Sequence, residues 1–137
     1  MFVAAMRLME ANMIKLQESG ENYLETILVL KNKNGNVRSI DIANELGYTK
    51  PSISRAMTIL KNADYVTIDD TTGYITLTDT GYNIAKAMYE RHQILSTYLI
   101  SLGVSPETAT RDACRIEHVI SEETFERIRQ NTIVKEQ

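Results

Sequence analysis

Two short helical patterns near the middle of the chain, separated by only a few residues, most constrain the fold. The first follows Ser39, a candidate N-cap, and ends at Gly47, where a glycine can take the left-handed conformation that closes a helix. The second opens with Pro51, which is well tolerated in a first helical turn, and runs to about Asn62. Two short helices joined by a tight linker are typical of the helix-turn-helix, whose second helix enters the DNA major groove.

Two runs of alternating apolar and polar residues follow this helix pair. They are Tyr65-Val66-Thr67-Ile68 and Tyr74-Ile75-Thr76-Leu77, separated by the polar run Asp69-Asp70-Thr71-Thr72-Gly73. Alternation predicts strands, and a polar turn between them predicts a hairpin. A hairpin in this place is the wing of a winged helix, so we predict a mainly α-helical fold with a small β-hairpin wing.

Amphipathic helical patterns flank the winged helix. One is expected over residues 20–31 with Ser19 as its cap, and a long one, capped by Thr78 or Thr80, should end near Gly103. Two further helices are predicted, one opened by Pro106 and running over 107–120, the other capped by Ser121 and beginning at Glu122. We therefore divide the chain into residues 1–78, an N-terminal arm and winged helix, and residues 79–137, a helical domain.

The composition predicts a soluble protein that stays in the cytoplasm. Hydrophobic residues make up 43% of the 137 residues and charged residues 24%. No apolar run reaches the roughly 20 residues of a membrane span, so no membrane association is expected. The single cysteine cannot form an internal disulfide. The apolar start, residues 1–12, is too short and poorly organised for a signal peptide.

The charge distribution favours DNA as a partner more than the net charge of −3 does. The segment from Gly47 to Asn62 contains Lys50, Arg55 and Lys61 and no acidic residue. DNA affinity comes from local neutralisation of phosphates, so such a stripe suits a phosphate-contacting surface. A solvated helix face would show the same charges.

Arg55 is the strongest candidate for reading a base, because arginine can donate two hydrogen bonds to guanine in the major groove. A phosphate contact by Arg55 is the alternative. Lys50 and Lys61 are expected to hold phosphates, and wing residues Thr71 and Thr72 are further backbone-contact candidates. The full set of predicted DNA-binding residues is Ser39, Thr49, Lys50, Pro51, Ser52, Ser54, Arg55 and Lys61.

A group of potential metal ligands lies in the predicted helix over 107–120. Positions three and four apart share a helix face, so Cys114, Glu117 and His118 would converge there. The chain's other histidine, His92, lies upstream in the long helix. The alternatives are that Cys114 is a small buried apolar residue and that Glu117 is a solvent-exposed helix carboxylate.

These patterns together resemble the iron- and manganese-dependent repressor family that includes the diphtheria toxin repressor and the manganese transport regulators. The resemblance covers nearly the whole chain. The residues that carry it are Ser19 to Ile27, Asp41-Ile42-Ala43, Pro51-Ser52-Ile53-Ser54, Leu77-Thr78-Asp79-Thr80-Gly81, Arg91-His92 and, most specifically, Ala113 to Ser121. It implies a winged-helix DNA-binding domain followed by a metal-binding and dimerisation domain. A homodimer would bind double-stranded DNA at a palindromic operator and repress metal-uptake genes.

The resemblance also implies a metal-ligand set, which this chain matches incompletely. Cys114 takes a position that is cysteine in the iron-type branch and a carboxylate in the manganese-type branch. Asn22 stands where the family has methionine or aspartate, and it could instead interact with the cap of its helix. Ser96 and Thr110 stand at two ligand positions of an ancillary site, which is therefore degraded. The implied set is Asn22, Glu25, His92, Cys114, Glu117 and His118.

The ligand types favour Fe(II). A soft thiolate with imidazoles suits Fe(II), Co(II), Ni(II) or Zn(II) better than Mn(II), which is the second choice. Ligands from both domains would couple metal binding to DNA binding, typically by about 1–3 kcal/mol.

Two rival functions remain. Cys114 and His118 could form a thiol–imidazole pair of an enzyme, but no oxyanion-stabilising glycine segment or orienting third group accompanies them, so we expect no enzymatic activity. The other rival is a metal-independent winged-helix repressor that senses an organic ligand or an oxidant through Cys114.

Overall fold

The computed structural model describes the backbone of residues 2–133 and the side chains of residues 3–4 and 17–132. It divides into two compact units, Met1–Lys86 and Ala87–Gln137. The predicted N-terminal arm lies largely outside the described side chains. None of the described helices has the length and apolar character that a membrane crossing requires. The elements are α1 (Phe2–Asn34), α2 (Ser39–Leu46), α3 (Lys50–Asn62), β1 (Val66–Ile68), β2 (Ile75–Leu77), α4 (Asp79–Ser101), α5 (Pro106–Ile116) and α6 (Glu122–Ile133).

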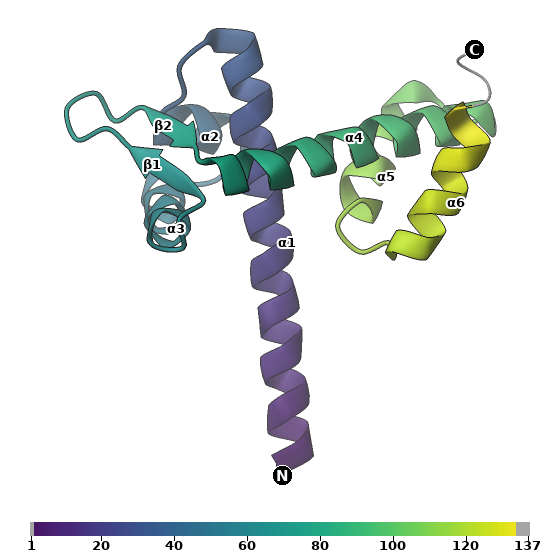
Figure 1. Cartoon of the computed structure of the whole chain (residues 1–137), viewed down its shortest axis with the longest axis horizontal. Helices are drawn as coiled ribbons and strands as arrows, with labels where there is room; N and C mark the ends of the chain where they lie inside the picture. Colours follow the sequence, from purple (N-terminus) through teal and green to yellow (C-terminus); the bar gives the residue numbers. More distant parts are fainter. Residues whose placement is uncertain (1, 134–137) are drawn as a thin grey trace. The chain divides into compact units, whose positions relative to one another are not determined.

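The first unit contains the predicted helix-turn-helix (Figure 1). Gly47 closes α2 with φ 72°, and the Thr49 hydroxyl caps α3 by accepting the Ser52 N–H, with Pro51 in the first turn. The predicted Ser39 cap is wrong by one residue. Arg38 is the N-cap, and its N–H donates to the carboxylate of Asp41 in the first turn at 2.8 Å, the bond that an acidic N3 residue makes in a capping box.

The core of the first unit is formed by the apolar faces of its helices and of the hairpin. Ile53, Met57 and Leu60 of α3 are buried as predicted, and Arg55 on the opposite face is exposed. Burial of these faces against α1 and α2 leaves the polar side of α3 in solvent. The buried apolar members of this core are Leu24, Ile27, Leu28, Leu30, Val37, Ile42, Ala43, Ile53, Met57, Leu60, Val66, Ile75 and Ala85.

The predicted start of the first helix is wrong. Ser19 lies inside α1 and has Gln17 and Glu18 before it in helical conformation. Glutamine and glutamate are good helix formers, and no proline interrupts the segment, so nothing ends the helix at Ser19. Asn22 is consequently not a first-turn residue, and a role for it at a helix cap is excluded.

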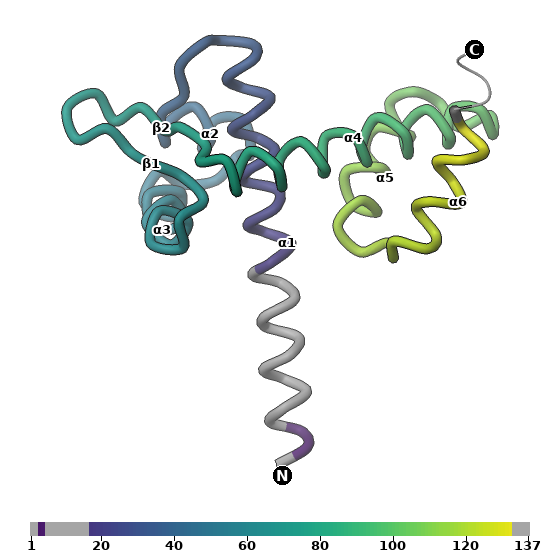
Figure 2. Tube along the Cα trace, viewed as in Figure 1, coloured from purple at the N-terminus to yellow at the C-terminus, as the bar shows by residue number. Residues whose placement is uncertain are grey.

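The wing is a two-stranded antiparallel hairpin, as predicted, with Val66 opposite Leu77 and Ile68 opposite Ile75. Figure 2 traces it in teal directly after α3. The hairpin returns the chain to the start of α4, where the Thr78 hydroxyl accepts the Gly81 N–H at 3.1 Å. Thr78, rather than Thr80, is therefore the cap of this helix.

Gly81 lets the start of α4 approach the hairpin closely. A Cβ built on Gly81 would lie 2.0 Å from the Tyr65 carbonyl oxygen, whereas one on Gly20 of α1 would meet its nearest neighbour, a Leu60 methyl carbon, at 3.8 Å. The Tyr65 oxygen is itself fixed, because it accepts the Thr78 N–H at 3.0 Å. Only backbone movement can relieve such a clash.

We therefore expect Gly81→Ala to lower the free energy of unfolding by about 1–3 kcal/mol, the usual cost of overpacking. The matched control, Gly20→Ala, should be neutral or stabilising by up to about 1 kcal/mol, because alanine is the better helix former. Urea unfolding of both variants measures the difference. Equal stability of the two variants would contradict the close approach.

The second unit consists of the later part of α4 with α5 and α6, which pack around a small apolar core (Figure 1). Leu95, Ala113 and Phe125 are its buried members. Ser105 and Ser121 cap α5 and α6, as their hydroxyls accept N–H groups three residues further on. The prediction that the α5 helix continues to residue 120 is wrong. It ends at Ile116, and residues 117–120 form a turn.

Candidate metal centre and DNA-binding face

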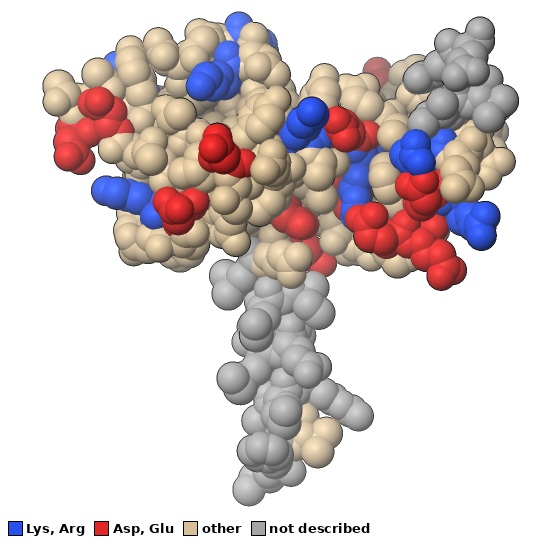
Figure 3. All heavy atoms as spheres, viewed as in Figure 1, with Lys and Arg blue, Asp and Glu red and all other residues tan. Residues whose placement is uncertain are grey.

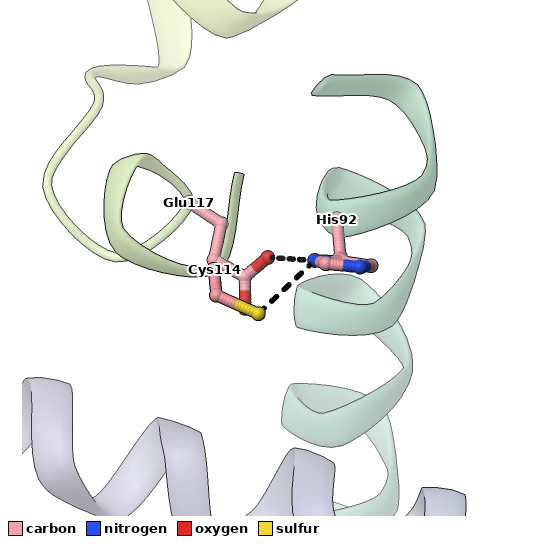
Figure 4. Close-up of side chains that lie close together, drawn as sticks. All are labelled: His92, Cys114 and Glu117. Atoms are coloured by element: carbon pink, nitrogen blue, oxygen red, sulfur yellow. Dashed lines mark hydrogen bonds and ion pairs between the residues drawn. The ribbon is translucent and has the colours of Figure 1, made fainter. Parts of the chain in front are cut away.

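The ligand cluster within the second unit forms between α4 and the C-terminal end of α5. His92 lies on α4, Cys114 in the last turn of α5, and Glu117 is the C-cap residue of α5. The His92 Nδ1 atom is 3.0 Å from Oε2 of Glu117 and 3.6 Å from Sγ of Cys114. Figure 4 shows the three side chains pointing at one another. One ligand atom from each lies within 4.8 Å of the others.

His118 lies next to the cluster and contacts Glu117. Cys114 and Glu117 converge as expected, because the C-cap residue Glu117 keeps α-helical dihedral angles, but His118 lies in the turn after the helix. The His118 Nε2 atom is instead 3.3 Å from Oε1 of Glu117. Glu117 therefore lies between two imidazoles, with one oxygen near each.

The burial of Glu117 and the exposure of Cys114 argue against the two non-metal interpretations of these residues. Glu117 is fully buried (0% exposed), so it is not a solvated helix carboxylate. Cys114 is exposed, so it is not a small buried apolar residue. A buried carboxylate needs a charged or hydrogen-bonding partner, and imidazoles from two directions supply it. One thiol, one imidazole and one carboxylate with converging ligand atoms fit a borderline divalent ion.

The cluster changes the protonation of His92. Hydrogen bonds to Cys114 and then to Glu117 raise the pKa of His92 to about 10, and burial opposes the shift. In the metal-free protein this imidazole carries a proton well above neutral pH. Because a metal ligand must be deprotonated, metal binding at His92 would release a proton. Affinity would then rise with pH up to about the pKa of His92.

An NMR titration of the metal-free protein checks this prediction. The chain has two histidines, so His118→Gln assigns both ring signals. His92 should titrate near pH 10, and Cys114→Ser should lower its pKa, because the bond to Cys114 is the largest cause of the shift. Titration of His92 near 6.5 in the unsubstituted protein would contradict the proposed contacts.

The predicted ligands Asn22 and Glu25 lie on α1, in the first unit. The backbone oxygen of Asn22 accepts a hydrogen bond from the Thr26 hydroxyl at 2.8 Å. This bond does not involve the side-chain amide of Asn22. At the two ancillary positions, Ser96 is buried and Thr110 is exposed.

The DNA-reading face predicted on α3 is a connected polar stripe. The Thr49 hydroxyl donates to Oγ of Ser52 at 2.8 Å, and Arg55 donates to the same oxygen at 3.4 Å. This chain of bonds orients the Arg55 guanidinium along the exposed side of the helix. Lys50, Pro51, Ser54 and Lys61 are also exposed, and Ser39 is half-buried at the start of α2.

The wing tip carries negative charge. The Asp69 carboxylate accepts the N–H groups of Thr71 and Thr72, both at 2.8 Å, and these bonds lower its pKa. Acidic atoms, shown red in Figure 3, cover the hairpin turn, where Asp70 also lies. These charges disfavour contact between the wing tip and DNA phosphates, so α3 is the better candidate.

Sequence reasoning did not foresee the roles of two arginines. Arg38, at the start of α2, lies 4.9 Å from the ring centroid of Tyr74 in the wing. Arg91, next to His92, contacts the turn that carries Glu117. The Arg91-His92 pair was visible as a motif, but its contacts are long-range and no local pattern signals them.

A winged helix followed by a helical unit with a His–Cys–Glu cluster has the organisation of metal-responsive transcriptional regulators. Residues 15–74 match the family described as "Iron dependent repressor, N-terminal DNA binding domain". Residues 78–132 match "Iron dependent repressor, metal binding and dimerisation domain". The chain belongs to the iron-dependent repressor family, whose members are metal-dependent transcriptional regulators.

Individual relatives agree with this family. The chain is 37% identical over 109 residues to the transcriptional regulator MntR of Escherichia coli O6:H1, across 80% of this chain and 70% of that protein. It is 33% identical over 110 residues to the HTH-type transcriptional regulator MntR of Geobacillus kaustophilus, across 80% and 77%. The solved structure of a manganese-dependent transcriptional repressor complex with manganese matches with a TM-score of 0.75 and 27% identity. That match covers 82% of this chain and 52% of the other, so this chain spans about half the length of that protein.

Proposed function

We propose that this chain is a metal-activated repressor of metal-uptake genes, which acts in the cytoplasm as a homodimer on a palindromic operator. The His92–Cys114–Glu117 cluster carries the proposal, because it lies within the segment that matches a metal-binding and dimerisation domain. The hydrogen-bonded polar residues at the start of α3, Thr49, Ser52 and Arg55, support DNA as the target.

The proposed ligands come from both units. His92, Cys114, Glu117 and His118 belong to the second unit, and Asn22 and Glu25 on α1 belong to the first. A bound divalent ion would supply positive charge that favours the arrangement in which both sets of ligands are engaged. Ligands in both units would thereby couple metal binding to the position of α3, with a typical coupling of about 1–3 kcal/mol.

Fe(II) is the proposed metal, with Mn(II) second and Co(II), Ni(II) or Zn(II) as further candidates. The exposed Cys114 thiol at 3.6 Å from the imidazole is the softest ligand in the set, and Mn(II) prefers harder oxygen donors. Asn22 also argues against Mn(II), because an amide oxygen in place of a carboxylate removes one negative charge from the proposed ligand set.

The test is selection of binding sites from a pool of random duplex DNA by anaerobically prepared protein, with Fe(II), with Mn(II) and with a chelator. We expect a palindromic sequence to be enriched with metal only, more strongly with Fe(II). Affinity for the selected duplex should rise between about 5- and 150-fold on metal addition. Enrichment of the same sequence in the presence of chelator would refute metal activation.

A variant of the first unit separates metal activation from metal binding. Glu25→Gln removes the only charged ligand proposed on α1, and the second-unit ligands remain. We expect metal still to bind, but to raise DNA affinity much less than in the unsubstituted chain. The matched control is Glu21→Gln, one turn earlier on α1, which should leave activation unchanged.

A further inference from the structure

Two residues of α4 hold Glu117, one through its carboxylate and the other through its backbone oxygen. Its carboxylate Oε2 lies 3.0 Å from Nδ1 of His92, and its backbone oxygen accepts a hydrogen bond from Nη1 of Arg91 at 3.1 Å. His92 and Arg91 are consecutive residues of the same helix. The orientation of the Glu117 side chain is therefore fixed by one residue and the position of its backbone by the next.

The Arg91 guanidinium also holds the rest of the turn that contains Glu117. It donates to the backbone oxygen of Ile120 at 3.4 Å, forms an ion pair with Glu122 at the start of α6, and lies 5.0 Å from the ring centroid of Phe125. The Arg91 side chain is only 13% exposed, whereas that of Glu122 is 84% exposed. The partly buried Arg91 side chain thus connects α4 to the chain from Glu117 to Phe125.

The turn needs such a contact because α5 ends just before it. Carbonyls at the C-terminal end of a helix lack intrahelical partners and carry partial negative charge. Within the turn, the N–H groups of Val119 and Ile120 both donate to the Ile116 oxygen. The carbonyl oxygen of Glu117, the first residue of the turn, accepts from Arg91. A guanidinium suits this place, because its planar fork offers several fixed donors together with positive charge.

We propose that Arg91 is a positioning residue of the metal centre, which sets the backbone of Glu117 so that its carboxylate lies between His92 and His118. The proposal rests on the metal-binding function proposed above. As a cation Arg91 is not itself a ligand, and it acts through Glu117. Residues that orient ligands typically change metal affinity 10–100-fold when they are replaced.

The test is anaerobic titration of the full chain with Co(II), an ion whose thiolate charge-transfer absorption reports its bond to Cys114. We expect Arg91→Met to lower Co(II) affinity about 10–100-fold and to alter the absorption spectrum, because the backbone of Glu117 would lose the contact that sets its position. Arg91→Lys keeps a positive charge but loses the planar fork. Its affinity should fall between those of Arg91→Met and the unsubstituted protein.

Two control variants isolate the role of the Arg91 guanidinium. Arg129→Met removes another arginine of the second unit, one whose ion pair with Glu126 lies within α6, and should leave affinity and spectrum unchanged. Glu122→Gln removes the exposed ion pair of Arg91 but keeps its carbonyl contacts. It should change Co(II) affinity by less than about fivefold, because exposed ion pairs contribute little.

The outcomes distinguish the two proposals. If Arg91→Met binds Co(II) with the affinity and spectrum of the unsubstituted protein, Arg91 does not position Glu117 and the inference is overturned, even if thermal unfolding shows lost stability. If Arg91→Met does not fold, the comparison of Arg91→Lys with Arg129→Met decides. If the unsubstituted protein itself binds no Co(II), the proposed metal function fails.

Discussion

Replacing Cys114 by serine is expected to lower the affinity for Co(II) and Zn(II) on the order of 100-fold or more. The substitution removes the softest ligand atom of the cluster, and even residues that only orient ligands contribute about 10–100-fold. Isothermal titration of the anaerobic protein measures the loss. For Co(II), the thiolate charge-transfer absorption should also disappear.

The change in metal preference is as informative as the loss of affinity. Cys114→Asp places a hard carboxylate where the thiol is, so affinity for Mn(II) should rise relative to Co(II) and Zn(II). Thr110→Ala, at an exposed position of the same helix, is the matched control and should change neither value. If Cys114→Ser binds all three ions like the unsubstituted protein, Cys114 is not a ligand and the preference for Fe(II) loses its main support.

The parts of the fold that depend on neighbouring residues could be predicted from the sequence. Gly47 ends α2 with positive φ, and the Thr49 cap with Pro51 opens α3, because each of these effects acts within one helical turn. The wing followed from alternation over a few residues. The predicted cap at Ser19 was wrong because the residues before Ser19 continue the helix. A residue that can cap a helix does so only where the preceding residues do not continue it.

The geometry of the cluster could be predicted only in part. The sequence brought Cys114, Glu117 and His118 together by their spacing, and the resemblance added His92. It could not show that α5 ends at Ile116, because the turn that follows is held by Arg91 from 26 residues earlier in the chain. Partners at that separation leave no periodic signal. The arrangement of Glu117 between two imidazoles therefore emerges only from the structure.

Replacing Arg55 by alanine is expected to have the largest effect on DNA recognition. A bidentate arginine–guanine contact contributes about 1–3 kcal/mol, and a homodimer makes the contact twice. The total of about 2–6 kcal/mol corresponds to a loss of operator affinity between about 30-fold and 20,000-fold, at 1.4 kcal/mol per factor of ten. The Arg55 side chain is exposed on α3, and its guanidinium donates to Oγ of Ser52 at 3.4 Å.

The control for Arg55→Ala is Lys61→Ala, the last basic residue of α3. A phosphate contact carries no sequence information, so Lys61→Ala should weaken binding to all duplexes alike and reduce the salt dependence of binding by about one unit of slope per contact. Arg55→Ala should instead relax selectivity at one base pair of each half-site. If Arg55→Ala weakens specific and nonspecific duplexes equally, Arg55 binds phosphate, and the sequence must be read by the other polar residues at the start of α3.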